Sequence, residues 1–355
     1  MAILVFPSSL AASVAFAGEA RRWGQTVIGA SSLETEPQAS AYTAWLRLPF
    51  ISDKSFFDAL ASVVDEHGIR SIYTPHPATY QFLARDLPIR LPGVALHDGG
   101  PVRKLMEQVG SRLSVGEAAL ASIDRLAGAS SGLNPAFVAA LLAQANTIPG
   151  QCTDEKLAAL CAIFQDAPKG DVVEIGSLFG KSAYVLNRLA SRFTIGATIA
   201  VDPWNMEFSV QRDSPSYLQE LSPSWDWDLV FAGFLLTMQA CATPPFNYIR
   251  ASSSRAWTHY ERASAIESEE FGRTPISGLI SVLHIDGNHD EQCVREDFTL
   301  WSRRLAPGGW LIFDDYEWSH GEGPRKIGDW AIANLAERIH RHFVAGGALF
   351  LKIEA

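Results

Sequence analysis

Hydrophobic residues in the first hundred positions alternate between the pattern of strands and that of helices. Strands are predicted at the short apolar runs 3–6, 26–29, 45–50 and 69–74. Helical spacing is found over 8–23, which ends at Gly24, and over 53–67, which ends at Gly68. Strands that alternate with helices are typical of a parallel sheet built from βαβ units. We therefore expect a small α/β domain over residues 1–100.

The next segment, residues 101–144, is predicted to be a helical connector. Its apolar residues follow helical spacing, among them Leu105, Val109, Leu113, Leu120, Ile123 and Leu126. Gly128, Ser130, Ser131 and Gly132 interrupt this pattern and indicate a hinge. The boundary between two domains is thus expected between residues 100 and 133.

The remaining residues, 145–355, alternate between helix and strand again. Strands are predicted at 172–175, 199–201, 246–250, 279–285 and 310–313, with helices between most of them. The tail, 342–354, is apolar around Gly346 and Gly347, which favours a terminal hairpin with an antiparallel edge strand. This pattern predicts a second α/β domain with a doubly wound, Rossmann-like sheet.

Composition narrows the range of functions. The hydrophobic fraction of 47% and the charged fraction of 19% are ordinary for a globular protein. The 39 acidic residues exceed the 29 basic ones, and the formal net charge of −10 disfavours broad electrostatic capture of nucleic acid or anionic lipid. We therefore expect neither nucleic acid nor a membrane as a partner.

The four cysteines predict no metal knuckle and no disulfide framework. They lie far apart and form no Cys-x-x-Cys pair, which indicates reduced thiols. The apolar opening stretch has no Lys or Arg before it, and no run of about 18 uncharged apolar residues occurs elsewhere, so neither a secretory signal nor a membrane span is expected. The expected compartment is the cytoplasm.

Two acidic clusters near the C-terminal end carry the candidate chemistry. Asp286 closes one predicted strand, and Asp314 and Asp315, which begin 28 residues later, close the next. The three carboxylates should therefore meet at one rim of the sheet, where hard oxygen ligands suit Mg²⁺, Ca²⁺ or Mn²⁺ better than zinc. His289 lies three residues past Asp286, so its imidazole could act as general base to a hydroxyl group.

A loop with two glycines follows the first strand of this second domain and opens a helix. Its candidate ligand-binding residues are Glu174, Gly176, Ser177, Gly180 and Ser182. The glycines let the chain turn tightly and bring backbone amides close to a ligand at the positive end of a helix. The next strand ends in Asp202, where the second strand of a nucleotide-binding sheet holds ribose hydroxyls.

This loop resembles motif I of class I S-adenosylmethionine-dependent methyltransferases, with the spacing Glu174-x-Gly176-x-x-x-Gly180-x-Ser182. The resemblance implies that Asp202 contacts the ribose, that the glycine loop wraps the methionine portion and that Glu174 helps to hold the amino group. Ser252 lies in the turn 251–253 after the following strand, where such enzymes often carry a Gly-Asp-Ser-like turn beside the adenine. The turn here is Ala-Ser-Ser, which leaves only hydroxyl or backbone contacts.

The acidic clusters resemble a more specific family. The Asp-x-x-His step at 286–289 and the interval to Asp314 resemble metal-dependent O-methyltransferases of the catechol type and of the macrolide-sugar type. The resemblance covers roughly residues 145–330 and implies that Asp286, Asp314 and Asp315 bind a divalent cation, with Mg²⁺ favoured, while His289 is the base. The first half loosely resembles the small domain that precedes ATP-grasp catalytic domains, but no grasp domain follows.

These features together predict a two-domain, metal-dependent O-methyltransferase. The expected acceptor is a hydroxyl of a sugar or of another polyhydroxylated small molecule, and the first domain is open to packing, homo-oligomer formation or substrate docking. One alternative is a metal-dependent hydroxylase of the cephalosporin hydroxylase type, although an iron oxygenase normally needs two histidines and one carboxylate. A second alternative is a non-catalytic S-adenosylmethionine-binding protein.

Overall fold

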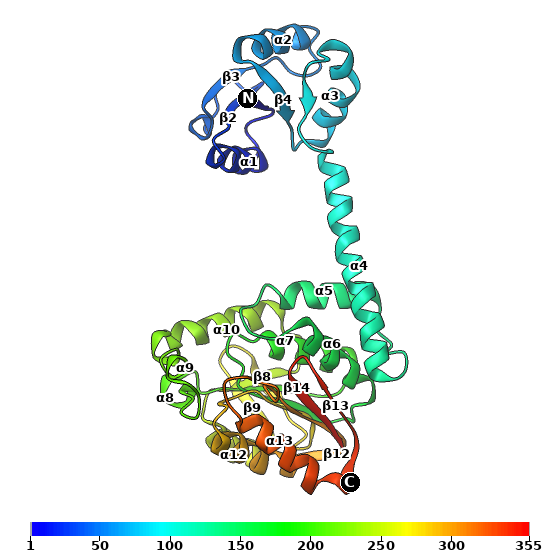
Figure 1. Ribbon diagram of the computed structural model, residues 1–355, viewed down its shortest axis with the longest axis vertical. Helices are drawn as coiled ribbons and strands as arrows, with labels where there is room; N and C mark the ends of the chain where they lie inside the picture. Colours follow the sequence, from blue (N-terminus) through cyan, green and yellow to red (C-terminus); the bar gives the residue numbers. More distant parts are fainter. Residues whose placement is uncertain (1, 355) are drawn as a thin grey trace. The chain divides into compact units, whose positions relative to one another are not determined.

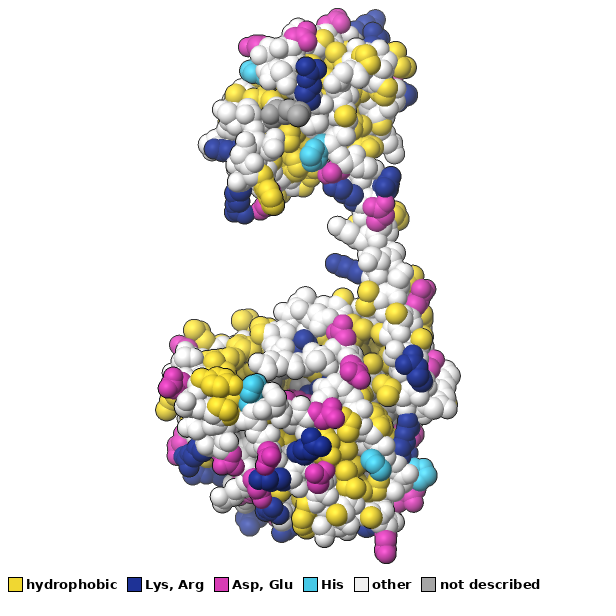
Figure 2. All heavy atoms as spheres, viewed as in Figure 1, with side chains coloured by type: hydrophobic (Ala, Val, Ile, Leu, Met, Phe, Trp, Pro, Cys, Tyr) yellow, Lys and Arg dark blue, Asp and Glu magenta, His cyan; other side chains and the backbone are white. Residues whose placement is uncertain are grey.

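The computed structural model describes residues 2–354, which divide into two compact units, one ending at Ser111 and the other beginning at Arg112 (Figure 1). Each unit contains its own sheet and its own hydrophobic cores. Acidic and basic side chains are interspersed on the face that Figure 2 shows. Among the described residues, no helix combines the length and the apolar character that crossing a membrane requires.

The N-terminal unit is built on a parallel sheet with the strand order β3-β2-β1-β4-β5. The strands are β1 (Ala2–Val5), β2 (Thr26–Ser31), β3 (Ala44–Arg47), β4 (Ile69–Tyr73) and β5 (Ala95–Leu96). They are connected in part by the helices α1 (Ala11–Arg22), α2 (Phe56–His67) and α3 (Pro77–Arg90). Leu4 and Ile72 of the central strands pack with Leu60 and Leu83 of the helices, which confirms the predicted α/β sheet.

Two element ends in this unit differ from the sequence prediction. The first helix begins at Ala11 instead of Ser8, because Ser8 is part of a buried turn in which its backbone N–H donates to the carbonyl of Ala30 at 2.7 Å. The third strand ends at Arg47 instead of residue 50. Pro49 has no N–H to donate to a neighbouring strand, which accounts for the earlier end.

A single helix, α4 (Pro101–Ala127), covers the first part of the predicted connector, and α5 (Pro135–Ala145) covers the rest. Gly128 and Gly132, both with positive φ, lie in the turn that separates the two helices. Ile123 on α4 is fully buried, whereas Leu105 on the same helix is 54% exposed. Helical spacing thus predicted the helix, but not which of its apolar residues are covered.

The C-terminal unit contains a seven-stranded sheet with the order β13-β14-β12-β11-β6-β7-β8. Its strands are β6 (Asp171–Ile175), β7 (Thr198–Val201), β8 (Phe246–Ile249), β11 (Ile280–Ile285), β12 (Leu305–Phe313), β13 (Ile339–Ala345) and β14 (Ala348–Ile353). The first five run parallel, and β13 and β14 form an antiparallel hairpin at one edge. The predicted terminal hairpin is therefore confirmed, with Gly346 and Gly347 in its turn.

Helices cover both faces of this sheet (Figure 1). They are α6 (Asp154–Ile163), α7 (Lys181–Arg192), α10 (Trp227–Cys241), α11 (Ser253–Arg262), α12 (Glu291–Trp301) and α13 (Gly323–Asn334). The segment between β7 and α10 adds the short helices α8 (Met206–Ser209) and α9 (Ser216–Gln219), and β9 (Ala265–Ser268) pairs with β10 (Gly272–Pro275). Val172 and Val173 of β6 enter two different cores, because neighbouring residues of a strand point to opposite faces. The sheet is thus doubly wound, as predicted.

Candidate active site

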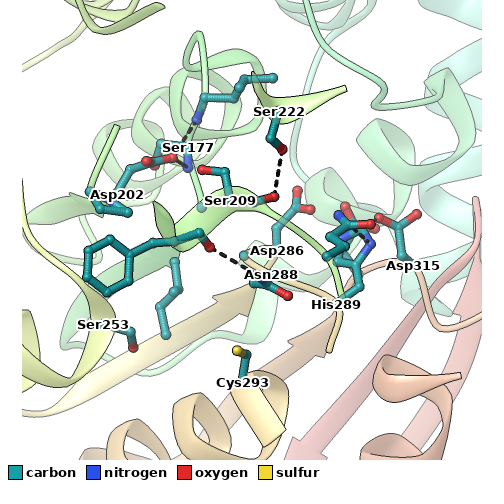
Figure 3. A pocket seen from close by; sticks show the side chains of 18 of the residues that line it. Ser177, Asp202, Ser209, Ser222, Ser253, Asp286, Asn288, His289, Cys293 and Asp315 are labelled. Carbon is teal, nitrogen blue, oxygen red and sulfur yellow. Dashed lines mark hydrogen bonds and ion pairs between the residues drawn. The ribbon is translucent and has the colours of Figure 1, made fainter. Parts of the chain in front are cut away.

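One cavity of about 720 Å³ opens at the carboxyl ends of the parallel strands of the C-terminal unit. It is lined by nine of the predicted site residues: Gly176, Ser177, Ser182, Asp202, Ser252, Asp286, His289, Asp314 and Asp315. In Figure 3, Ser177 and Asp202 lie at one end, His289 and Asp315 at the other, and Asp286 between them. The fold therefore joins the glycine loop and the acidic clusters in a single space.

Gly176 lets the loop after β6 pass directly over the end of β11. Its φ is +85°, and a Cβ at this position would lie 2.1 Å from the carbonyl oxygen of Asp286. Any side chain would therefore push the two strand ends apart. Gly180 also has positive φ, at +89°, and forms the N-cap of α7, but it does not line the cavity.

Asp202 fixes the glycine loop through its carboxylate. Its Oδ2 accepts hydrogen bonds from the backbone N–H groups of Ser177 at 2.9 Å and Leu178 at 3.0 Å, and its Oδ1 accepts one from Trp204 at 2.7 Å. Burial raises the pKa of Asp202, and these backbone hydrogen bonds oppose the shift because they favour the charged carboxylate. Asp202 thus orders the loop as well as facing the cavity.

Glu174 does not line the cavity, in contrast to the role that the family resemblance implied. It is fully buried. Its Oε2 accepts a hydrogen bond from the Ser177 hydroxyl at 2.6 Å, and its Oε1 lies 3.0 Å from His284 Nδ1. Glu174 and His284 are direct neighbours in the register of β6 and β11, so their side chains meet on one face of the sheet. Glu174 therefore supports the loop from below, and His284 is fully buried beside it.

Asp286 and Asp314 come together at the ends of β11 and β12, and both contact Lys156. The Lys156 Nζ lies 3.2 Å from Asp286 Oδ2 and forms a direct ion pair with Asp314 Oδ2. Only 2% of the Lys156 side chain is exposed. Sequence reasoning missed this residue, which lies 130 positions before Asp286. The one available signal was a lysine directly before an apolar stretch, 157–164.

The two neighbouring carboxyl groups have opposite pKa shifts. Burial raises the pKa of Asp286 well above its usual range, and the adjacent Asp314 raises it further. Burial also acts on Asp314, but the Lys156 ammonium and a hydrogen bond from Asp286 outweigh it, so the pKa of Asp314 lies below its usual range. Two close carboxylates disfavour double ionisation, and a nearby cation decides which of them is charged.

His289 forms a pair with Asp315 on the outer side of this cluster. Its Nε2 lies 3.0 Å from Asp315 Oδ2, its Nδ1 is 3.2 Å from Gln211 Nε2, and its ring packs edge-on against Trp318 at 4.7 Å between centroids. A Gln amide N–H donates, so Nδ1 is the acceptor and the Nε2–H faces Asp315 in the neutral tautomer. The carboxylate thereby orients the imidazole.

The donor atoms are suited to a divalent cation. Ligand atoms of Asp286, His289 and Asp315 lie within 4.8 Å of one another, and so do those of His284, Asp286 and Asp314. Carboxylate oxygens are the ligands that Mg²⁺ and Mn²⁺ prefer. The residues present therefore fit such an ion, and Asp286 is common to both groups.

The segment between β7 and α10, with the first residue of α10, closes one side of the cavity with aromatic residues. Phe208, Trp225 and Trp227 line it, whereas Trp204 is buried beneath the glycine loop and donates from its ring N–H to the carbonyl of Leu178 at 2.8 Å. Asn288 ties this segment to the end of β11, because its side-chain amide donates to the carbonyl of Phe208 at 3.0 Å.

A match to a family model identifies the kind of domain. Residues 173–316 match a family model described as a methyltransferase domain. No curated protein matches the chain in sequence.

Solved structures with a similar fold include O-methyltransferases, all at low identity. NovP is 13% identical, with 56% of this chain and 80% of NovP covered and a TM-score of 0.42. CalS11, a TDP-rhamnose 3'-O-methyltransferase of calicheamicin biosynthesis, is 12% identical, with 83% and 92% covered and a TM-score of 0.34. MycE of mycinamycin biosynthesis, bound to Mg, SAH and mycinamycin VI, is 16% identical, with a TM-score of 0.31; the match covers 52% of this chain and 45% of MycE.

The match of the family model covers the end of β6, the strands β7, β8, β11 and β12, and most of the residues that line the cavity. The sheet order around β6 and the glycine loop after it are those expected for a nucleotide-binding parallel sheet. Residues 173–316 of this chain thus form a methyltransferase domain with the class I, Rossmann-like fold.

Proposed function

We propose that this enzyme transfers a methyl group from S-adenosylmethionine to a hydroxyl of a sugar or of another polyhydroxylated small molecule, with the help of a divalent cation. One observation carries the proposal: the glycine loop with Asp202 and the cluster of acids with His289 line the same cavity. Methyl transfer needs a donor site and an acceptor site in one space, because the oxygen must attack in line with the methyl carbon. The favoured cation is Mg²⁺.

The donor half of the cavity consists of the loop after β6 and the residues that follow β7 and β8. The hydroxyls of Ser182 and Ser252 offer hydrogen bonds to the methionine portion and the adenosine. The backbone N–H groups of Gly176, Ser177 and Leu178 already donate to Val201 and Asp202, so they hold the loop in place beside the ligand. Asp202 accepts two backbone N–H groups at Oδ2 and one at Oδ1, so a ribose hydroxyl would use the one remaining lone pair, on Oδ1. Glu174 has no part in this half, because it is enclosed beneath the loop.

In the acceptor half, His289 would accept the proton of the attacking hydroxyl. Both ring nitrogens have partners in this structure, Gln211 at Nδ1 and Asp315 at Nε2. His289 can therefore act as a base only after one of these contacts opens. Asp315 is the partner that a cation would attract away. Nε2 would then accept the proton in the other tautomer, in which Nδ1–H donates to the carbonyl oxygen of a flipped Gln211 amide.

Asp286, Asp314 and Asp315 would hold the divalent cation. When bound, such an ion lowers the pKa of a hydroxyl that it coordinates and fixes its position. The aromatic side chains of Phe208, Trp225 and Trp227 line the cavity and would exclude water from the acceptor. An acceptor with two neighbouring oxygens fits this arrangement best, because it can chelate the cation.

The test is a screen of sugars and catechols for a methylated product by mass spectrometry, with Mg²⁺ or with EDTA. We expect product with Mg²⁺, loss of product with EDTA and recovery when Mg²⁺ is returned. His289→Ala should lower kcat by about 10²–10⁴ while leaving donor affinity, measured by calorimetry, unchanged. Full turnover in EDTA would contradict the role of the metal, and donor binding without turnover on any acceptor would favour a sensor of S-adenosylmethionine.

A further inference from the structure

Lys156 is a buried cation at the acidic end of the cavity. It lies in the first turn of α6, where the hydroxyl of Thr153 accepts from its backbone N–H at 3.2 Å, and all residues from Lys156 to Ile163 are buried. Lysine is almost never fully buried without a charged partner, because transfer of an ammonium from water is costly. Here the partners are Asp286 and Asp314.

These partners are two of the three carboxylates proposed to hold the divalent cation. Lys156 Nζ forms ion pairs with Oδ2 of Asp286 and Oδ2 of Asp314, and carboxylate oxygens of the same two residues are potential ligands of an ion. An ammonium is a compact point charge on a flexible stem, so it can occupy a position between two carboxylates much as a metal ion does. A divalent cation at this position would lie against the ammonium and repel it.

His284 adds an independent sign that this position suits a metal ion. Its Nε2 is buried, has no hydrogen-bond partner within residues 2–354 and lies 3.9 Å from Asp286 Oδ2. Its other ring nitrogen contacts Glu174, an arrangement that commonly orients a metal-binding imidazole. Asp286, Asp314 and His284 thus form a potential ligand set that Lys156 enters from one side.

Only the side chain of Lys156 is free to leave. The turn of the β13–β14 hairpin packs against the start of α6, and a Cβ on Gly346 would lie 2.5 Å from the backbone nitrogen of Lys156. The backbone is therefore fixed, whereas the neighbouring segment 149–152 lines the open cavity. The four-carbon stem can carry the ammonium toward this space without moving the helix.

We propose that the Lys156 ammonium and a divalent cation are alternative partners of Asp286 and Asp314, so that the ion binds there only when Lys156 withdraws. Lys156 then acts as a positioning residue that weakens cation binding and keeps the two carboxylates compensated between binding events. The inference rests on the cation site of the proposed function, but it concerns binding of the ion, not methyl transfer.

The first test measures the Kd of Mn²⁺ by electron paramagnetic resonance and calorimetry for the full chain and for Lys156→Met and Lys156→Gln. Both variants should bind Mn²⁺ at least roughly tenfold more tightly, because the competing charge is gone. Lys181→Met is the matched control: Lys181 lines the same cavity and forms no ion pair with an acid in the described chain, so its removal should change the Kd less than about threefold. Equal or weaker Mn²⁺ binding by the Lys156 variants would overturn the proposal.

A second measurement uses the unaltered chain and does not depend on the folding of a variant. Lysine acylation followed by mass spectrometry should modify Lys156 slowly without Mn²⁺ and markedly faster at saturating Mn²⁺, since the ammonium then faces the cavity. Unchanged protection of Lys156 at saturation would overturn the proposal. Neither readout requires turnover, so a protein that displaces Lys156 but methylates nothing would contradict the proposed function alone.

Discussion

In each unit the first strand of the sheet, β1 or β6, lies inside the sheet: the next strands along the chain lie on one side of it, and the later strands lie on the other side. The strand order therefore reverses at β1 in the N-terminal unit and at β6 in the C-terminal unit. Open α/β sheets bind ligands outside the carboxyl end of the strand where this reversal occurs. At β6 this end borders a cavity of about 720 Å³. At β1 the turn that follows the strand is covered by side chains of the unit itself, and Ser8 is fully buried.

The residues that fill the position beyond β1 form a connected polar cluster. The Tyr42 hydroxyl donates to the carbonyl of Ser8 at 2.6 Å, the Ser8 hydroxyl donates to Glu36 at 2.9 Å, and the Trp45 ring N–H donates to the Ser8 hydroxyl at 3.2 Å. The ring of Tyr42 covers Gly29, where a Cβ would lie 2.5 Å from it. Burial, with a smaller contribution from Glu36, raises the pKa of Tyr42 to about 12.

The difference lies in the residues that follow the first strand. After β6 comes Gly176, which allows the loop to turn over β11 and places the loop at the cavity wall. After β1 come Phe6, Pro7 and Ser8, which lack this freedom, and the carbonyls of Pro7 and Ser8 accept hydrogen bonds from hydroxyls of the same unit. Topology thus marks where a ligand can bind, and the local residues decide whether the space is open.

The largest effect is expected when a single methyl group is added to the loop of the open site. Gly176→Ala would place a Cβ against the backbone of Asp286 in a left-handed conformation, so the loop must shift. We expect the affinity for S-adenosylhomocysteine, measured by calorimetry, to fall at least about 100-fold, which corresponds to roughly 3 kcal/mol.

Gly29→Ala is the matched control for this change. It adds the same methyl group at the filled position of the other sheet, against the Tyr42 ring, and should destabilise the N-terminal unit while leaving donor affinity unchanged. Circular dichroism checks that both variants fold. Normal donor binding by Gly176→Ala would show that the close approach to β11 is not needed.

Much of this contrast is readable from the sequence, because it depends on strand order and strand ends. Apolar runs located every strand of the doubly wound sheet, and the rule that parallel strands end at one rim brought Asp202, Asp286 and Asp314 together correctly. The spacing of Gly176 likewise indicated a tight approach of the backbone.

The sequence did not reveal the direction of individual side chains or the contacts between residues far apart in the chain. Glu174 lies one residue before the last residue of β6, so its side chain points to the face of the sheet opposite that of Ile175. There it meets His284 of β11 instead of a ligand. Lys156 reaches the acids from a helix whose packing depends on the terminal hairpin, and no local pattern encodes that contact. These contacts depend on how the layers pack, which periodicity does not describe.

A smaller effect is expected for two buried acids: Asp297 beside the open cavity and Glu36 in the cluster beyond β1. Asp297 on α12 borders the open cavity, and burial raises its pKa to about 7 against the hydrogen bond from Ser253. The unfolded chain releases this proton at lower pH than the folded chain, so stability falls as the pH rises from about 4 to about 7 and stays reduced above it. Asp297→Asn removes this loss.

We therefore expect Asp297→Asn to raise the free energy of unfolding at pH 8 by about 2 kcal/mol, less than the roughly 4 kcal/mol of the full shift, because the cavity admits water. The gain should vanish near pH 4. Glu36→Gln is the counterpart in the cluster beyond β1, where the Glu36 carboxylate accepts a hydrogen bond from the Ser8 hydroxyl. This change should lower the free energy of unfolding by about 1 kcal/mol. Urea titrations at both pH values measure these differences, and a gain for Asp297→Asn that is equal at pH 4 and pH 8 would contradict the pKa argument.

The smallest effect tests whether the cluster beyond β1 serves only to fill its position. Tyr42→Phe keeps the ring over Gly29 but removes the hydroxyl that donates to the buried carbonyl of Ser8. The unpaired carbonyl should cost about 1 kcal/mol of unfolding free energy in the N-terminal unit, because a buried acceptor without a partner loses its hydration. Donor affinity and methyl transfer should not change, since the variant leaves the residues that line the cavity intact. A drop in turnover at unchanged stability would mean that the N-terminal sheet takes part in substrate docking. Both sheets would then contribute to function, each in a different role.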